Sequence, residues 1–196
     1  TIRPSMVAGS SSPAIDVTVR GGSGEDRIDT TLLAAGTDIR IEAGAGDDTV
    51  VGGAGDDTVA AGGGIDQIFL GTGIDRAIFG AGELTLLDQV VADQGVAGDV
   101  LEVTLAANRT LPGNAFAGVQ GIDTFLFDAA GAGAAVRLPA NLVGPSGLTT
   151  VLVDVIADDG VFVDGRALIE KVTKSGGNVD YTLKSGVPAV TNKSEK

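Results

Sequence analysis

The sequence contains no cysteine and no histidine among its 196 residues. Disulfides, His-ligated zinc and Ser-His-Asp or Cys-His nucleophiles are therefore excluded. Aromatic residues are scarce, with six Phe, one Tyr and no Trp, so the core volume must come from Val, Leu, Ile and Ala. Paired carboxylates could still hydrolyse glycosides, but aromatic platforms for a sugar are missing. We expect no enzymatic activity.

Basic residues are also few, with 13 Lys and Arg against 26 Asp and Glu, which gives a net charge of −13. An acidic surface repels nucleic acid and anionic membranes and attracts cations. No stretch is long and apolar enough to span a membrane, and the opening residues lack the hydrophobic run of a signal peptide. We expect no nucleic-acid partner and no membrane insertion. Thr1 is compatible with a removed initiator methionine and with a piece of a longer protein.

Glycine is abundant, with 31 residues, and it recurs with aspartate at a period of nine. In four contiguous copies the second and fourth positions are always Gly, the sixth is always Asp and the eighth is small or aliphatic. A fixed period of this kind predicts a solenoid, in which each unit stacks on its neighbours. The contiguous copies are AGAGDDTVV (43–51), GGAGDDTVA (52–60), AGGGIDQIF (61–69) and LGTGIDRAI (70–78), and GGSGEDRID (21–29) stands alone upstream.

This spacing supplies the oxygens that calcium requires. Ca²⁺ takes about six to eight oxygen ligands, glycine turns can point successive carbonyls to one side, and the Asp adds charge. Two nine-residue units make one coil, so we expect Asp48 to lie under Asp66 and Asp57 under Asp75, with an ion between stacked turns. Without calcium the stacked carboxylates repel one another, so folding and calcium binding should be coupled.

A degenerate copy, LAAGTDIRI (33–41), separates the isolated unit from the tandem run. Asp38 occupies its sixth position, on the side where Asp57 is expected. Its eighth position is Arg40, so we expect the strand phase to slip and the isoleucines on either side of Arg40 to point inward. Mere turn punctuation is the alternative interpretation of all these copies. The recurrence of Asp at one phase argues against it, because turns accept Asn or Ser equally well.

The tandem copies resemble the GGxGxDxUx nonapeptides of the RTX calcium-binding repeat family, which form a parallel β-roll. The resemblance covers residues 21–78 and implies several bound Ca²⁺ ions and a secreted or cell-surface setting. The run departs from the pattern at the first position, where Ala43, Ala61 and Leu70 replace Gly. The implied aspartate ligands are Asp26, Asp48, Asp57, Asp66 and Asp75, with Asp38 by analogy; the implied carbonyl donors lie around Gly22, Gly24, Gly44, Gly46, Gly53, Gly55, Gly62, Gly64, Gly71 and Gly73.

The whole chain is predicted to be all-β, a parallel β-roll or β-solenoid with an irregular β-rich continuation or cap. We divide it into an N-terminal arm with a capping strand (1–20), the calcium-binding repeats (21–78), an irregular β-rich region (79–184) and a flexible tail (185–196). Alternating runs predict strands in the third region, and ALIEKVTK (167–174) is its one helix candidate. The runs are GDVLEV (98–103), GVQGIDTFL (118–126), AAVRL (134–138), TTVLVDV (149–155), GVFVDG (160–165) and VDYTL (179–183).

Two functions are compatible with these features. The first is a non-catalytic structural module, stiffened by calcium, in an extracellular assembly such as an S-layer, an adhesin or a virion surface. Its partners would be proteins, including further copies of the same chain. The second is the calcium-binding C-terminal module of a protein exported by a type I system. The flanking reading frame or the intact mass of the native protein distinguishes the two.

Overall fold

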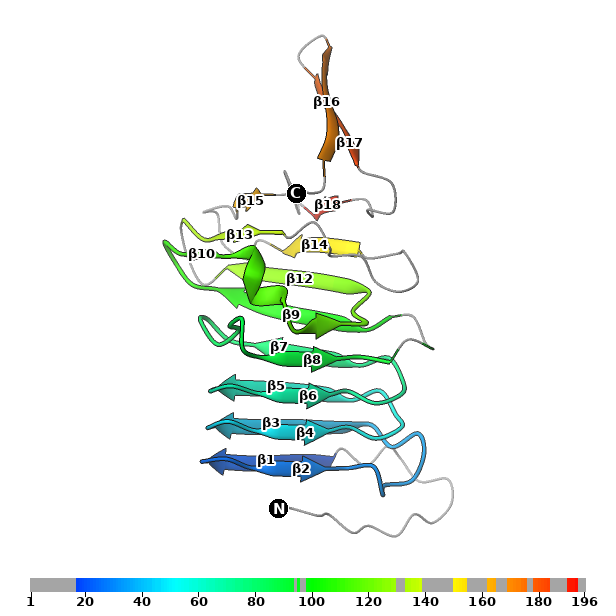
Figure 1. Ribbon diagram of the computed structural model, residues 1–196. Helices are drawn as coiled ribbons and strands as arrows, with labels where there is room; N and C mark the ends of the chain where they lie inside the picture. Colours follow the sequence, from blue (N-terminus) through cyan, green and yellow to red (C-terminus); the bar gives the residue numbers. More distant parts are fainter. Residues whose placement is uncertain are drawn as a thin grey trace.

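The computed structural model describes residues 17–93, 95, 98–129 and 133–138, together with five later strands. It is a parallel β-solenoid of about five turns with nearly no helix (Figure 1). The predicted all-β fold is therefore confirmed. The later strands are β14 (Thr150–Asp154), β15 (Phe162–Asp164), β16 (Ile169–Ser175), β17 (Asn178–Leu183) and β18 (Val190–Lys193).

The solenoid has two main parallel sheets, and the chain passes from one to the other at every turn of its lower coils. The first sheet has the order β1-β3-β5-β7-β9-β12-β14-β18 and the second has the order β11-β8-β6-β4-β2. In the first sheet, β1 is Val17–Ser23, β3 Ile39–Ala45, β5 Thr58–Gly63, β7 Arg76–Phe79, β9 Val100–Leu105 and β12 Thr124–Ala129. In the second, β2 is Arg27–Asp29, β4 Thr49–Val51, β6 Gln67–Phe69, β8 Gln89–Val91 and β11 Val119–Gln120.

Strand register confirms that two nine-residue units form one coil. Val50 pairs with Ile68, and Val59 pairs with Ala77, each 18 positions further along the chain. Because both sheets keep this register, the turns at each edge of the solenoid lie directly above one another.

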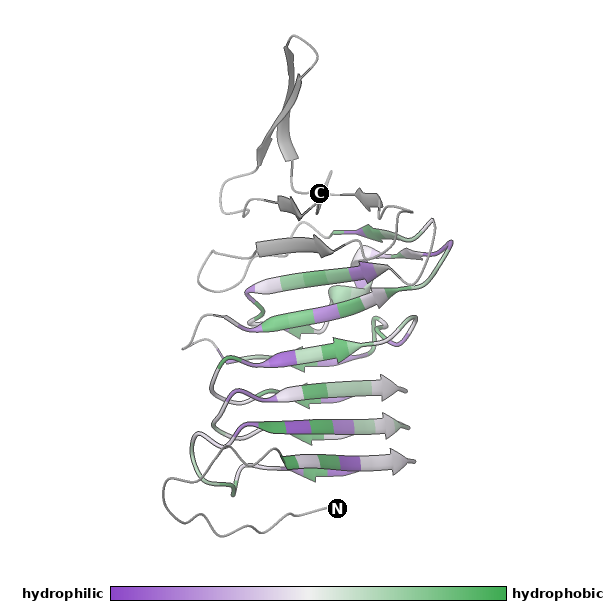
Figure 2. Cartoon of the chain, turned by 180° about the vertical axis from the view of Figure 1, so that it is seen from behind, coloured by the Kyte–Doolittle hydropathy of each residue, from purple (hydrophilic) through white to green (hydrophobic). Residues whose placement is uncertain are grey.

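Side chains from both sheets fill the space between them. Residues at the eighth position of each repeat point inward, as predicted, and so do the apolar residues at the first position. Burial in the core explains why the first position departs from Gly. The eighth-position residues Val50, Val59, Ile68 and Ala77 and the first-position residues Ala43, Ala61 and Leu70 are all at most 1% exposed. Figure 2 shows hydrophilic and hydrophobic residues alternating along the strands.

Above the tandem repeats the coils lengthen and the core becomes aromatic. A short 3₁₀ helix, η1 (Gly113–Phe116), brings Phe116 against two rings of β12. Phe116 meets Phe125 edge-on with ring centroids 5.8 Å apart, and it meets Phe127 in the same way at 6.0 Å. A smaller parallel sheet of β10 (Thr110–Leu111), β13 (Ala135–Arg137) and β15 accompanies these coils. The predicted strands at 98–103 and 134–138 are thus confirmed.

The predicted helix at 167–174 is wrong. Residues Ile169–Ser175 form strand β16, which pairs antiparallel with β17. A helix of two turns gains too little from its own hydrogen bonds to form without packing, whereas Ile, Val and Thr favour an extended chain with a cross-strand partner. The segments 1–16, 184–189 and 194–196 lie outside the described residues.

Strands continue without interruption across the predicted boundary at residue 78. β7, at the end of the repeats, pairs in parallel with β9 over four residues. One edge strand of the first sheet is β1, which pairs with β3. The division of the chain into functional regions stays a prediction.

Candidate metal centre

Aspartates form a column at each edge of the solenoid, where the chain turns from one sheet to the other. The first column consists of Asp26, Asp48, Asp66 and Asp88, and the second of Asp57, Asp75, Asp99 and Asp123. Within each column the backbone N–H of one aspartate donates to a side-chain oxygen of the aspartate in the next coil. The N···O distances are 2.8 Å for Asp26–Asp48, 3.0 Å for Asp48–Asp66, 2.8 Å for Asp66–Asp88, 2.8 Å for Asp57–Asp75, 2.8 Å for Asp75–Asp99 and 3.2 Å for Asp99–Asp123.

Most of these carboxylates are buried, and four of them carry an oxygen with no hydrogen-bond partner. Asp48, Asp57, Asp66, Asp75, Asp88 and Asp99 are each at most 1% exposed. The unpartnered atoms are the Oδ2 oxygens of Asp48, Asp66, Asp75 and Asp99. A buried anionic oxygen without a partner is costly, by several kcal/mol in order of magnitude. A cation at each column edge would remove this cost.

Burial also raises the pKa of the column carboxyls. Desolvation is the main cause for Asp66 and Asp99, each raised to about 6, and for Asp75, raised to about 7. Backbone hydrogen bonds oppose the increase, and the neighbouring aspartates of the column add to it. The pKa values of Asp48 and Asp57 are raised for the same leading reason. Without a cation, the columns therefore disfavour their own ionisation.

Glycine allows the backbone of each turn to lie against the turn below. A Cβ on Gly62 would lie 1.7 Å from the carbonyl oxygen of Gly44, and a Cβ on Gly64 would lie 2.2 Å from that of Gly46. The carbonyls therefore reach the same edges as the aspartates. Eight of the ten predicted carbonyl donors have positive φ, namely Gly22, Gly24, Gly44, Gly46, Gly62, Gly64, Gly71 and Gly73. Gly53 and Gly55 do not, but a Cβ on Gly55 would lie 2.4 Å from the carbonyl oxygen of Thr37.

The predicted alignment of Asp38 with Asp57 is wrong by one residue. The N–H of Ile39 donates to Oδ1 of Asp57 at 3.0 Å, and the N–H of Asp56 donates to Oδ1 of Asp38 at 2.8 Å. The predicted inward slip is confirmed, because Ile39 and Ile41 are 3% and 0% exposed. Their burial moves Asp38 into an exposed outer row with Asp47 and Asp56. Its role as a metal ligand stays a prediction.

The outer row lies beside the columns at the fifth position of the repeats. Asp47 accepts a hydrogen bond from the N–H of Ile65 at 2.8 Å, and Asp56 accepts one from the N–H of Ile74 at 2.9 Å. Both aspartates are exposed to solvent. They are solvated charges that link neighbouring turns by hydrogen bonds.

Three column members were absent from the predicted ligand set: Asp88, Asp99 and Asp123. The coils that contain them are longer, with spacings of 22 to 24 residues between successive column aspartates in place of 18. Asp99 belongs to a Gly-Asp pair directly before a predicted strand, and Gly121 stands two residues before Asp123. Asp99 and Asp123 could therefore have been found from the sequence. Asp88 had no such sequence signal, because four inserted residues put Leu84 at the expected position.

The described residues contain no group of three or more His, Cys, Asp or Glu side chains arranged to hold a metal. A calcium ion here would therefore take one carboxylate from each of two stacked turns and complete its shell with backbone carbonyls or water, as hard oxygen ligation allows. The donor set consists of oxygens alone, which fits calcium and excludes a thiolate or imidazole site.

Comparison with known families identifies the tandem run. Residues 40–77 match the RTX calcium-binding nonapeptide repeat, in four copies. The chain carries RTX calcium-binding repeats. Searches among curated proteins and solved structures found no match. The RTX match begins in β3 and ends in β7, so it includes Asp48, Asp57, Asp66 and Asp75 but neither the isolated copy nor the longer coils.

RTX repeats in a β-solenoid suggest a calcium-binding β-roll module. Repeats of this family are typical of extracellular or secreted proteins. A helix that could cross a membrane is not found in the part of the chain that the structure describes.

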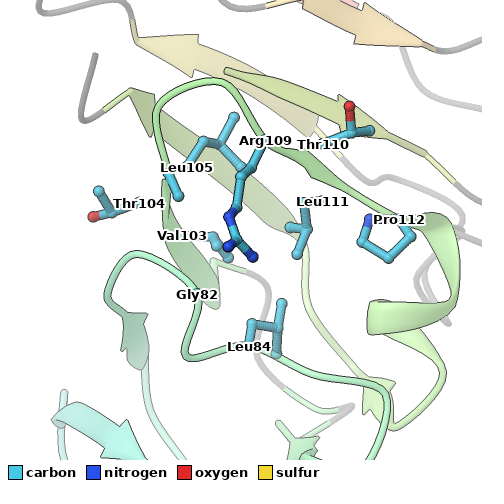
Figure 3. A pocket seen from close by; sticks show the side chains of 10 residues that line it. Gly82, Leu84, Val103, Thr104, Leu105, Arg109, Thr110, Leu111 and Pro112 are labelled. Atoms are coloured by element: carbon cyan, nitrogen blue, oxygen red, sulfur yellow. The ribbon is translucent and has the colours of Figure 1, made fainter. Parts of the chain in front are cut away.

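A cavity of about 160 Å³ lies in the longer coils, and no column aspartate is among its lining residues. Its lining is mostly apolar, with Leu84, Leu105 and Leu111 surrounding the side chain of Arg109 (Figure 3). Arg109 is the only ionisable residue among the lining residues. The cavity therefore offers no pair of carboxylates for acid–base chemistry.

Proposed function

We propose that this chain is a non-catalytic structural module whose β-roll is held in its folded state by calcium. The observation that carries the proposal is the set of buried, unpartnered Oδ2 oxygens of Asp48, Asp66, Asp75 and Asp99. Bound calcium would supply positive charge at these oxygens. The chain's own contribution is to hold the carboxylates and carbonyls in stacked turns.

The energy available from calcium is large enough for this role. A ligand that binds only the folded state stabilises it by RT ln(1 + [L]/Kd), about 2.7 kcal/mol per site at a hundredfold excess over Kd. Several such sites together reach the range of roughly 5–15 kcal/mol that separates folded from unfolded domains. Calcium binding would therefore stabilise the folded state, and this role does not require calcium to regulate a chemical reaction.

The setting that we propose is an extracellular assembly, such as an S-layer, an adhesin or a virion surface, with protein partners that include further copies of this chain. Three features support it: RTX repeats are typical of extracellular proteins, the net charge of −13 suits a calcium-rich medium, and His- or Cys-based catalysis is unavailable. The acidic surface also argues against nucleic acid as a partner.

A second candidate is the calcium-binding C-terminal module of a type I secreted protein. The raised pKa values of Asp66, Asp75 and Asp99 favour it, because columns that resist ionisation should remain unfolded at low cytosolic calcium and fold after export. The intact mass of the native protein separates the candidates. A mass equal to this chain supports an assembly subunit, and a much larger mass supports the secreted module.

Thermal unfolding tests the calcium-dependent fold that both candidates share. Circular dichroism should report strand in millimolar calcium, and the midpoint should fall steeply in excess EGTA. Magnesium at the same concentration is the control, because it prefers strict octahedral geometry and retains its waters. An unchanged midpoint on chelation would show that the repeats are structural turns without a calcium function.

A further inference from the structure

The second column extends past the RTX match into a coil that lacks the nonapeptide pattern. Asp75 is the last aspartate of the matched run, and Asp99 lies above it after 24 residues. The backbone N–H of Val100 donates to the carbonyl oxygen of Asp75 at 2.8 Å, as Arg76 does to Asp57 one coil below. The longer coil therefore returns its aspartate to the same register as a repeat.

Asp99 presents the same side-chain geometry as the aspartates of the repeats. It is 0% exposed, and its Oδ1 accepts the N–H of Asp75 at 2.8 Å. Its Oδ2 has no hydrogen-bond partner, and neither has the Oδ2 of Asp75. Two buried carboxylates in adjacent turns thus each carry one unpartnered oxygen.

The first column ends differently at the corresponding level. Asp88 is also buried, but both of its oxygens accept backbone hydrogen bonds, one from Asp66 N–H at 2.8 Å and one from Thr85 N–H at 2.6 Å. Neither oxygen of Asp88 is therefore left without a hydrogen-bond partner. Asp88 closes the first column by hydrogen bonding, whereas Asp99 leaves the second column open to an ion.

Asp123 supports the Asp99 turn from the coil above. Its Oδ2 accepts the N–H of Gly98 at 2.8 Å and the N–H of Asp99 at 3.2 Å. These two bonds hold the backbone on which Asp99 stands. Asp123 is therefore a positioning residue for Asp99.

We propose that Asp75 and Asp99 share a calcium ion, at a site that is half inside and half outside the RTX repeats. The inference rests on the proposed calcium-binding function and adds a site to it. The first column has no such added site at Asp88. Calcium stabilisation thereby reaches β9 and the aromatic part of the core.

Calorimetric titration of the full chain with calcium tests the site. Asp99→Asn keeps the side-chain oxygen for the N–H of Asp75 and removes the charge, so we expect the loss of one bound calcium or at least a tenfold weaker affinity for one. Asp88→Asn is the charge control, with the same loss of charge at the same level of the other column. Because Asn has one acceptor oxygen and Asp88 uses two, circular dichroism in calcium first checks that this variant folds; its calcium stoichiometry should then be unchanged. Asp48→Asn, inside the repeats, should lower calcium binding and shows that the assay detects a lost ligand.

The outcomes distinguish a failure of the proposed calcium function from a failure of the added site alone. If the wild-type chain binds no calcium, the proposed function and the added site are both overturned. If the wild-type and Asp48→Asn behave as expected but Asp99→Asn binds like wild type, only the added site is overturned. An equal loss in Asp88→Asn and Asp99→Asn would also overturn it, since net charge would then explain both.

If circular dichroism in calcium shows that Asp99→Asn does not fold, wild-type crystals grown in calcium provide the test. An anomalous difference peak between the Asp75 and Asp99 turns is expected. Peaks at the Asp48 and Asp66 turns without one at Asp99 would overturn the added site.

Discussion

Asp47 and Asp48 are neighbours in the chain but occupy opposite environments. Asp48 is 1% exposed and has an unpartnered oxygen, whereas Asp47 is exposed and accepts a backbone hydrogen bond from the turn above. Successive residues of an extended segment point to opposite sides, and the turn preserves this alternation. The position of Asp48 therefore suits a cation ligand. The position of Asp47 suits a solvated side chain that hydrogen-bonds to the neighbouring turn.

Asp66→Asn should have opposite effects with and without calcium. In EGTA at pH 8 the variant should be more stable than wild type, on the order of 1–3 kcal/mol, because a buried carboxylate whose pKa is raised to about 6 no longer has to ionise. In calcium the variant should be less stable, because a ligand is lost. Urea unfolding in both buffers measures the change.

Asp47→Asn is the control for that experiment. The side chain is exposed and keeps an oxygen for the N–H of Ile65, so stability should change by less than about 0.5 kcal/mol in either buffer. A calcium-independent effect of Asp66→Asn would contradict a metal-ligand role for Asp66.

Gly62→Ala and Gly63→Ala should differ sharply, although the two residues are adjacent. Gly62 has φ +89° and no room for a Cβ, which would lie 1.7 Å from a backbone oxygen; Gly63 has open space. We expect Gly62→Ala to destabilise the calcium-bound fold by more than about 2 kcal/mol. Gly63→Ala should stay within about 0.5 kcal/mol. Equal midpoints in thermal unfolding would show that the turn can relax around a side chain.

The single coil is the repeating element, and it is too small to be stable alone. Its strands β4 and β6 have three residues each, and each buries its inward side chain against neighbouring coils and the opposite sheet. Stability in such stacks comes from interfaces between neighbouring coils. Mutations at inward positions should therefore affect several coils together.

Ile68→Ala should cost about 2–5 kcal/mol, the usual range for truncating a fully buried isoleucine. Ile68 is 0% exposed, whereas Ile65, three residues earlier, is 41% exposed at an outer turn. Ile65→Ala is thus the matched control and should cost less than about 1 kcal/mol. Chemical unfolding in calcium measures both, and similar losses would contradict the inward register of β6.

At the scale of the whole molecule, one hydrophobic core joins the repeats to the longer coils. The same cluster of buried residues includes Val50 and Ile68 in the repeats and Phe127 and Leu138 beyond them. The continuous core of the described residues favours shared unfolding of the repeats and of the coils that follow, up to residue 138.

The pH dependence of stability should reverse on adding calcium. In EGTA, carboxyls whose folded pKa values are raised to about 6 and 7 bind more protons folded than unfolded. Their destabilising effect is therefore greatest above pH 7 and disappears as the pH falls toward the unfolded value near 4. The calcium-free protein should be more stable at pH 5 than at pH 8. With calcium, protons compete for the same oxygens, so stability should fall over the same interval.

Thermal midpoints at pH 5 and pH 8, each with EGTA or calcium, measure this reversal. Matched ionic strength is the control, because the net charge of −13 makes the fold sensitive to salt. Parallel slopes in the two buffers would contradict coupling between the columns and calcium.

The sequence by itself determined the solenoid, the inward positions and the stacking of Asp48 under Asp66 and Asp57 under Asp75. These features depend on local chemistry: glycine permits the turns, aliphatic residues at one phase require burial, and an unbroken period of nine leaves one possible register. Four consecutive copies have the same turn and burial pattern, so an alternative register would be unfavourable in every copy.

Only the tertiary structure decided the positions where the period breaks. Burying Ile39 and Ile41 outweighs placing a polar side chain in the column, which moves Asp38 to the outer row. Asp88, Asp99 and Asp123 enter the columns because backbone pairing with the coil below sets their register, whatever the length of the preceding loop. Ile169–Ser175 is a strand because β17 pairs with it. In each case the local structure is determined by a contact between residues distant in sequence. The local sequence pattern does not show which residues make that contact.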